Sequence, residues 1–177
     1  DVHSINTLSV DAAYVTTANS RFSSRFGKYY YENKRYRELS GSVRAGIPNS
    51  QLQAERSHTA NLSLNFATRG NKLNATVEVF DERTKKMVMP NKAVPVYGFG
   101  EIYENSAELK TQGIEFSMQA SLFQKKNFEW IVGANISHYK SELTKLGSTT
   151  ERINDFSDGS AVISKVGESP YSFYGYK

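Results

Sequence analysis

Apolar and polar residues alternate along residues 112–139, and this pattern predicts two long β-strands joined by a short polar turn. The first strand places Ile114, Phe116 and Met118 on one face and Glu115 and Ser117 on the other. After the turn at residues 123–128 the apolar positions resume, as Trp130, Val132, Ala134 and Ile136. Side chains alternate faces along a strand, so each strand has one apolar and one wet surface. Strands of about 9–11 residues cross a membrane in outer-membrane barrels, and these two are long enough.

The same alternation recurs elsewhere and predicts four more strands, at residues 8–14, 39–45, 61–66 and 73–79. Two further segments are candidate strands, residues 22–31 and 171–176. No segment has the periodicity of a helix of convincing length, although residues 101–110 could form one or two helical turns. The pattern therefore predicts an all-β chain.

The connections between these strands differ sharply in length. Residues 69–72 and 123–128 form short links, whereas long polar excursions occupy residues 83–111 and 139–166, with a link of middling length at residues 45–57. Successive connections of an antiparallel meander lie at opposite ends of the sheet, so short and long links are expected to lie on opposite rims. Outer-membrane barrels have this arrangement, whereas unstructured excursions of about 29 residues are uncommon in compact domains. We therefore predict an antiparallel up-and-down β-meander that is part of a transmembrane β-barrel.

Composition agrees with this prediction and limits the alternatives. Hydrophobic residues make up 38% of the 177 residues and aromatic residues 12%, and the aromatic content excludes an ordinary disordered tail. A barrel with one apolar face fits these values. A self-contained soluble β-sandwich or barrel, which would bind carbohydrate through loop aromatics, fits them too and remains the alternative. The chain starts at Asp1 without an initiator Met or signal peptide, so we expect a piece of a longer protein.

Charge and motifs exclude several functions. The net charge of +4 comes with short basic clusters that lie beside acidic residues, so no nucleic-acid partner is predicted. There is no Cys, and His3, His58 and His138 have no companion at metal-ligand spacing. Neither a nucleophile elbow nor a phosphate-binding loop occurs. We predict no catalytic, cofactor-binding or metal-binding residues, and the chain is not expected to be an enzyme.

Aromatic side chains are the remaining candidates for function. Tyr97, Phe99 and Tyr103 lie in the long excursion before Gly113, where they could stack on sugar rings or grip a peptide. Alternatively, they pack the excursion onto itself or its neighbours. A second aromatic set lies near strand ends, where barrels carry girdles at the membrane interface: Phe66, Phe80, Phe123, Phe128, Trp130 and Tyr139.

Motifs at residues 52–66, 104–118, 127–137 and 166–177 resemble those of one family, the SusC/RagA-like TonB-dependent outer-membrane transporters. Residues 104–118, with Asn105 and Gly113-Ile114-Glu115, resemble that family's "N…GIE" strand entry, and residues 127–137 resemble its next strand. Residues 166–177 resemble its segment with a Val-Gly pair, a proline and Ser-Phe-Tyr-Gly-Tyr. Residues 52–66 are similar to the strand that precedes these. The resemblance covers residues 52–177, and the first fifty residues match it only vaguely.

The resemblance implies a large barrel closed around a plug domain in the outer membrane of a Gram-negative bacterium of Bacteroidetes type. Members import glycans or oligopeptides, are energised by TonB and work with a SusD-like surface lipoprotein. Under this interpretation residues 1–177 are a barrel fragment with neither plug domain nor C-terminal strand. Its partners would be the lipid bilayer and, through the parent chain, TonB, the lipoprotein and the substrate. No cofactor is implied.

Overall fold

The computed structural model describes residues 5–28, 31–37, 39–44, 46–94, 96, 98–155 and 161–175. The chain divides into two compact units. Unit 1 consists of Asp1–Val15, His58–Glu82 and Thr111–Ser141, and unit 2 consists of Thr16–Ser57, Arg83–Lys110 and Glu142–Lys177. The long strands contribute residues to both units.

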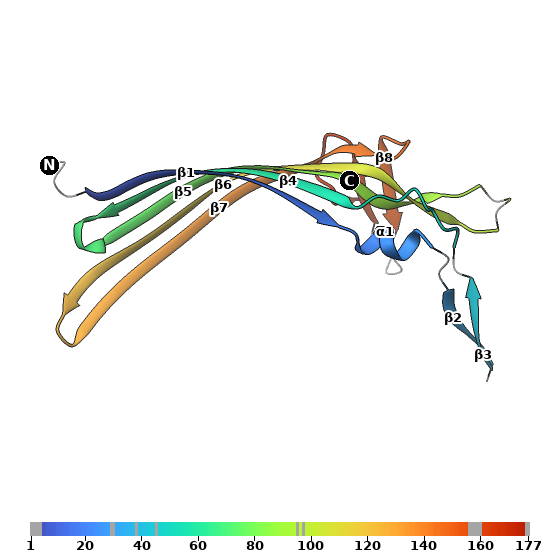
Figure 1. The fold of residues 1–177 in the computed structure, drawn as a ribbon, viewed down its shortest axis with the longest axis horizontal. Coiled ribbons are helices and arrows are strands. Elements are labelled where there is room, and N and C mark those ends of the chain that lie inside the picture. The colour runs from blue at the N-terminus through green and yellow to red at the C-terminus, as the bar shows by residue number, and fades with distance from the viewer. Residues whose placement is uncertain are drawn as a thin grey trace. The chain divides into compact units, whose positions relative to one another are not determined.

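The largest sheet has five strands in the order β1-β4-β5-β6-β7 (Figure 1). These strands are β1 (Ile5–Asn19), β4 (Glu55–Thr68), β5 (Leu73–Lys92), β6 (Glu101–Lys125) and β7 (Phe128–Leu146). From β4 to β7, spatial neighbours are also neighbours in sequence, so this part of the sheet is an up-and-down meander. The predicted all-β, antiparallel meander is confirmed, and five of the six clearly predicted strands lie in this five-stranded sheet.

Two short links join strands within unit 1. The short 3₁₀ turn η2 (Arg69–Asn71) connects β4 to β5, and Gly70 takes the positive φ of 74° that glycine adopts without strain. The Thr68 Oγ1 accepts a hydrogen bond of 2.9 Å from the Leu73 amide and so closes this turn. Residues 126–127 form the turn between β6 and β7. Both hairpin turns lie at the same end of the unit 1 sheet, as predicted for the short links (Figure 1).

The strands are much longer than their apolar stretches. The predicted excursion over residues 83–111 is largely strand, because β5 continues to Lys92 and β6 already begins at Glu101. The suggested helical turns at residues 101–110 are therefore wrong. Likewise β7 extends to Leu146, and β4 begins at Glu55, within the predicted link. Outside the apolar stretch these segments are mostly polar in sequence and no period of two marks them, yet the strands continue.

Unit 2 contains the smaller elements. The helix α1 (Arg21–Phe26) occupies the first part of residues 22–31, so the strand suggested there is wrong over that part. The strand β2 (Tyr31–Tyr36) comes after it in the sequence. β2 pairs antiparallel with β3 (Leu39–Arg44), which is the sixth predicted strand. A separate three-stranded sheet has the order β10-β9-β8. Its strands are β8 (Glu151–Asp155), β9 (Ala161–Lys165) and β10 (Ser172–Tyr174), so the suggested strand near residue 171 is confirmed as a short one.

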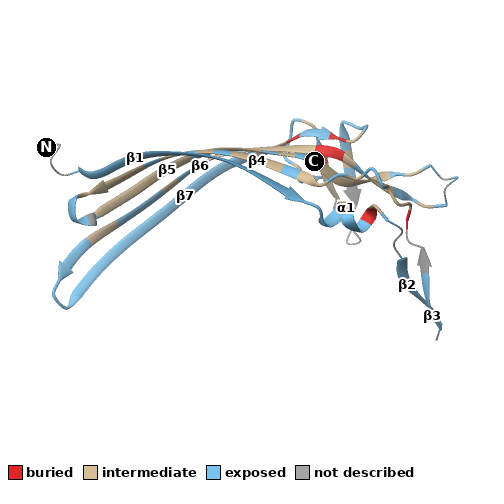
Figure 2. Cartoon of the chain, in the orientation of Figure 1, coloured by how far each residue is buried: buried red, intermediate tan, exposed pale blue. Residues whose placement is uncertain are grey.

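Buried apolar side chains are confined to unit 2 among the described residues. They are Phe26, Ala107, Leu143 and Leu146. The described residues of unit 1 include no buried hydrophobic side chain, as Figure 2 shows by the absence of red along this part of the sheet. A sheet without a buried side is a single layer, and none of the described residues of unit 1 covers either of its faces.

Candidate functional site

One face of the unit 1 sheet is apolar on all five strands, and we call it the apolar face. Along β6 this face runs from Ile114 to Leu122, about 27 Å at roughly 3.4 Å per residue. Hydrophobic bands of outer-membrane barrels are about 25 Å tall. Ten of its side chains have 36% to 68% of their surface exposed: Leu8, Val10, Leu62, Leu64, Val77, Val79, Ile114, Met118, Val132 and Ile136.

Two side-chain pairs lie towards the two ends of the unit 1 sheet. Next to the β6–β7 turn the rings of Phe123 and Trp130 stack with centroids 6.0 Å apart. Towards the other end, the Tyr14 hydroxyl lies 3.1 Å from Nδ1 of His58. Amphipathic rings favour the membrane–water interface, and a girdle at Phe123 and Trp130 stays a prediction.

The opposite face of unit 1, which we call the polar face, carries hydrogen bonds from strand to strand. The Asn65 Nδ2 donates to Oδ2 of Asp11 on β1, at 2.6 Å. The Thr76 hydroxyl of β5 donates to Oδ1 of Asn65, at 2.8 Å. One amide side chain therefore links three strands, and its position in the alternation opposite Leu64 and Phe66 explains why it faces this side.

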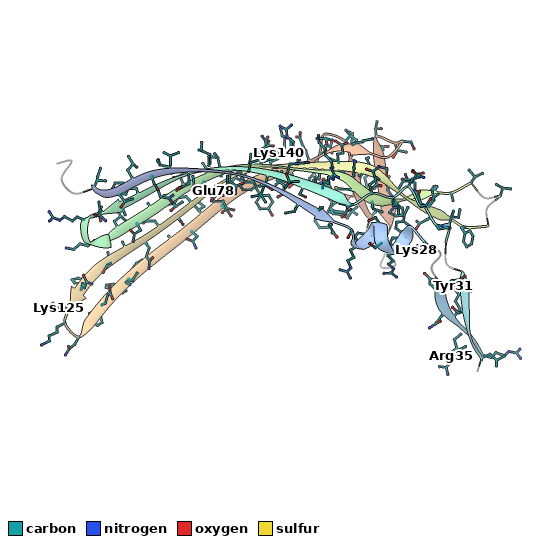
Figure 3. All side chains as sticks on the ribbon, viewed as in Figure 1. Lys28, Tyr31, Arg35, Glu78, Lys125 and Lys140 are labelled. Atoms are coloured by element: carbon teal, nitrogen blue, oxygen red, sulfur yellow. The ribbon has the colours of Figure 1, made fainter. Side chains whose placement is uncertain are left out.

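A cleft of about 340 Å³ lies on the unit 1 strands β5, β6 and β7. Two carboxylates contribute to it, Glu78 from β5 and Glu115 from β6. Its lining is otherwise mostly hydroxyl and amide groups: Thr76, Ser117, Asn135 and Ser137, with Phe116 and Ile136. Hydrated walls of this kind suit the lumen of a barrel. Figure 3 labels Glu78 on the sheet.

Phe80 does not belong to the girdle, contrary to the prediction. Its position alternates with Val79 and matches that of Glu78, which places it on the polar face. A Cβ atom built on Gly113 would meet Cζ of Phe80 at 2.6 Å and the His138 carbonyl oxygen at 2.9 Å. Gly113 therefore leaves room for the aromatic ring of the neighbouring strand.

The loop aromatics predicted to bind ligand are only partly brought together. Tyr97 lies outside the described residues, and Phe99 is half-buried in the link before β6. Tyr103 lies on β6, and its ring stacks on Phe26 of α1 with centroids 3.8 Å apart and planes 5° apart. Tyr103 thus packs unit 2, the second of the two roles that the sequence left open. Ligand binding by the three aromatics stays a prediction.

Asn105 holds together the segments around Tyr103, a role that sequence reasoning missed. Its Oδ1 accepts a 2.7 Å hydrogen bond from the Gln53 amide. Its Nδ2 donates to the carbonyl oxygens of Gln53 and Lys86, at 2.9 and 2.6 Å. The resemblance quoted Asn105 as part of a strand entry, which was the one signal available.

The described part of the chain contains no group of three or more His, Cys, Asp or Glu side chains that could hold a metal ion. Within the same residues no helix has the length and apolar character needed to span a membrane.

Comparison with known families identifies this arrangement. The family model described as "TonB dependent receptor-like, beta-barrel" matches residues 5–173. The chain is 26% identical over 187 residues to the TonB-dependent receptor P3 of Formosa agariphila, covering all of this chain and 19% of that protein. It is 24% identical over 162 residues to the TonB-dependent receptor SusC of Bacteroides thetaiotaomicron, covering 86% of this chain and 15% of that protein.

Solved structures show the same fold. A structure of the RagAB peptide transporter superposes with a TM-score of 0.79 at 23% identity, covering 98% of this chain and 19% of that one. A structure of the RagAB peptide importer in the "open-open" state gives a TM-score of 0.78. The chain spans less than a fifth of the length of these relatives. Because the family model matches nearly the whole chain, the chain belongs to the TonB-dependent receptor β-barrel family.

Proposed function

We propose that this chain is a wall and extracellular-loop segment of a TonB-dependent outer-membrane transporter that imports glycans or oligopeptides. The observation that carries the proposal is the exposed apolar face of unit 1, where large side chains from five strands have no protein cover in the described residues. An apolar surface of this extent is stable where lipid covers it. The polar face would then line a hydrated lumen.

The orientation follows from the lengths of the links. Outer-membrane barrels have short periplasmic turns and longer extracellular loops. The short turns at η2 and residues 126–127 would therefore face the periplasm, and the opposite ends of the same strands would face the extracellular side. A SusD-like surface lipoprotein would meet the parent protein on that side, and TonB would act from the periplasm.

The substrate class is supported only by the relatives. One relative is named SusC and the solved structures are titled as peptide transporters, so both glycans and oligopeptides are retained for this chain. We retain Tyr97, Phe99 and Tyr103 as candidate contacts with the substrate.

Fractionation of the source cells tests the proposal directly. An antibody raised against the 19.9 kDa chain should detect a much larger protein in the outer-membrane fraction. Extraction of the membranes with carbonate should leave that band in the pellet. A band near 19.9 kDa in a soluble fraction would instead support a self-contained carbohydrate-binding β-module.

A further inference from the structure

A cleft of about 590 Å³ lies wholly within unit 2. Strand β6 contributes residues 104–108 to it, and β5 and β7 contribute one lysine each, Lys86 and Lys145. The segment that precedes β4 supplies the remaining wall. Amide side chains are the commonest group in the lining: Asn49, Gln51, Gln53 and Asn105.

The wall that precedes β4 is held to β6 at both of its ends. At one end, Nδ2 of Asn49 donates a 2.9 Å hydrogen bond to the Tyr103 carbonyl oxygen. At the other end, the Gln53 amide donates to Oδ1 of Asn105, and Nδ2 of Asn105 donates to the Gln53 carbonyl oxygen, at 2.7 and 2.9 Å. Between these contacts, the Gln51 amide donates to Oδ1 of Asn49 at 3.0 Å. The wall is therefore fixed before a ligand arrives, which lowers the entropic cost of binding.

The polar groups that remain available in this cleft are mostly donors. Among the described residues, none makes a hydrogen bond or ion pair with the side chains of Gln51 and Lys145, and both residues are exposed. The Oε1 atom of Gln53 accepts a hydrogen bond from Nζ of Lys86. This contact leaves the Gln53 side-chain nitrogen and the other N–H groups of Lys86 able to donate. A ligand that supplies acceptor atoms, and above all a negative charge, suits such a set.

Two glutamates also contribute to the lining, but their carboxylates belong to the other face of β6. The Asn91 Nδ2 donates to Oε2 of Glu104 at 2.7 Å and to Oγ of Ser106 at 3.3 Å, so these two side chains share one face. Side chains two residues apart lie on the same face of a strand, which places Glu108 there as well. Asn105 lies on the opposite face, with the donors of the cleft.

We infer that this cleft binds a carboxylate group of an oligopeptide. The inference rests on the proposed function, because it names the substrate class of that transporter. The Lys145 ammonium would pair with the carboxylate, and the side-chain nitrogen of Gln53 would add a charge-assisted hydrogen bond. Gln51 offers one acceptor and one donor group, which match the N–H and C=O groups of the neighbouring peptide unit.

The same lining favours a peptide over a sugar. Sugar rings present apolar C–H groups that pack on aromatic rings, and the described residues that line the cleft include no aromatic residue. Tyr103 contributes its backbone carbonyl to the wall, while its ring stacks on Phe26 with centroids 3.8 Å apart. Amide side chains next to a lysine instead match the alternating donors and acceptors of a peptide backbone that carries a carboxylate.

Binding of a defined peptide to the purified full-length protein tests the inference. The probe is a dye-labelled heptapeptide of alanine and serine with one central glutamate and a free C-terminus, and fluorescence anisotropy measures its affinity. We expect Lys145→Glu to bind it about tenfold more weakly, since an attraction is replaced by a repulsion. Lys145→Arg keeps the charge and should bind within about twofold of the unmodified protein.

Lys28 provides the matched control. It is an exposed lysine of unit 2 that does not line the cleft, and Figure 3 labels it. Lys28→Glu introduces the same charge change and should leave the affinity for the peptide unchanged. If Lys145→Glu does not fold, Lys145→Gln takes its place, with an expected loss of about fivefold for one solvent-screened ion pair. Equal losses at residues 28 and 145, or no loss at either, would overturn the inference.

Variants of the peptide identify which carboxylate is recognised. Glutamine in place of the central glutamate removes the side-chain carboxylate, and C-terminal amidation removes the terminal one. We expect one of these changes to weaken binding about fivefold and so to identify the source. Unchanged affinity of the peptide that lacks both carboxylates would contradict the inference. Tighter binding of an oligogalacturonate, with the same dependence on Lys145, would replace the peptide by an acidic glycan.

The outcome for the proposed function is separable from the outcome for this cleft. If the protein is absent from the outer-membrane fraction, the proposed function fails. If it is present there but binds the peptide equally well with Lys145→Glu, only the inference about this cleft fails.

Discussion

Gly113 is the residue at which the smallest change should have a clear effect. Replacing it by Ala places a Cβ atom 2.6 Å from the Phe80 ring and 2.9 Å from the His138 carbonyl oxygen. The ring can turn, but the backbone oxygen of β7 cannot move without disturbing the sheet. We expect Gly113→Ala to destabilise the full-length barrel by roughly 1–3 kcal/mol, the usual cost of overpacking. The temperature at which the folded band disappears in a heat-modifiability gel measures the effect.

Gly133 provides the matched control on the neighbouring strand. A Cβ atom there meets only the Met118 carbonyl oxygen, at the ordinary contact distance of 3.5 Å. Gly133→Ala should therefore leave the gel transition within about 0.5 kcal/mol of the unmodified protein. Equal destabilisation by the two substitutions would show that close packing on Phe80 and His138 is not what selects glycine at residue 113.

At the scale of single residues, the sequence predicted correctly which face a side chain lies on where alternation alone determines it. It did not predict contacts that depend on the neighbouring strand. The apolar set on β6 follows from period two alone. Phe80 was assigned to a girdle because it ends an apolar stretch, yet its own phase matches Glu78. Its contact with Gly113 depends on the register between β5 and β6, which a single sequence does not specify.

The hydrogen bonds of Asn105 give a second prediction, for the segment that precedes β4. Asn105→Ala removes three hydrogen bonds to Gln53 and Lys86 backbone groups and adds none. Each unsatisfied backbone group costs about 1–3 kcal/mol when buried, and less here because the site is only partly buried. Amide hydrogen exchange at Gln53 should become about tenfold faster, a change of about 1.4 kcal/mol in local opening. Asn127→Ala, in the exposed β6–β7 turn, should leave that exchange rate unchanged.

At the scale of an element, β7 offers two adjacent positions on opposite faces. Ala134 lies on the apolar face, midway between Trp130 and His138, and Asn135 lines the cleft on the unit 1 strands. Arg on the lipid side at the bilayer midplane costs about 2–4 kcal/mol, whereas substitutions facing the lumen are tolerated. We expect Ala134→Arg to lower the yield of folded protein in the outer membrane strongly.

Asn135→Arg serves as the comparison and should fold to near the normal yield, since Glu78 and Glu115 line the same cleft. Quantitative heat-modifiability gels of outer-membrane fractions measure both variants. If Asn135→Arg were the more damaging of the two, the assignment of the faces would be reversed, and with it the lipid contact proposed for the apolar face.

The ends of the long strands were one part of the fold that the sequence did not predict; α1, β8 and β9 were others. In a membrane barrel, burial in lipid imposes alternation only on the stretch that crosses the membrane, which under the proposed function is residues 114–122 of β6. Beyond it, β5 and β6 continue as strands over residues such as Arg83 and Lys110, whose polarity matches that of a loop. Hydrogen bonding between the strand backbones there does not depend on an apolar face. The polar composition of these residues therefore predicted a loop, whereas the structure has paired strands.

The whole molecule has exposed edges as well as an exposed face. β1 and β7 are the outer strands of the five-stranded sheet, and in unit 1 the described residues bury no hydrophobic side chain. Unpaired strand edges and apolar surfaces both promote association in water. A chain that spans 19% of its first relative would meet neighbouring strands and lipid only in a complete barrel.

The isolated 177-residue chain should therefore aggregate in water and become dispersed only in detergent. Static light scattering of the refolded chain, with and without a non-ionic detergent above its micelle concentration, measures this aggregation.

A decisive variant replaces Val77, Ile114 and Ile136 on the apolar face by Thr, which keeps β-propensity and removes apolar surface. Because the apolar face drives association, this variant should aggregate far less than the unmodified chain, whereas Thr at Glu78, Glu115 and Asn135 of the polar face should not reduce aggregation. A monodisperse monomer of the unmodified chain in water would contradict the lipid-facing role, because a sheet whose apolar face has no cover does not stay monomeric without one.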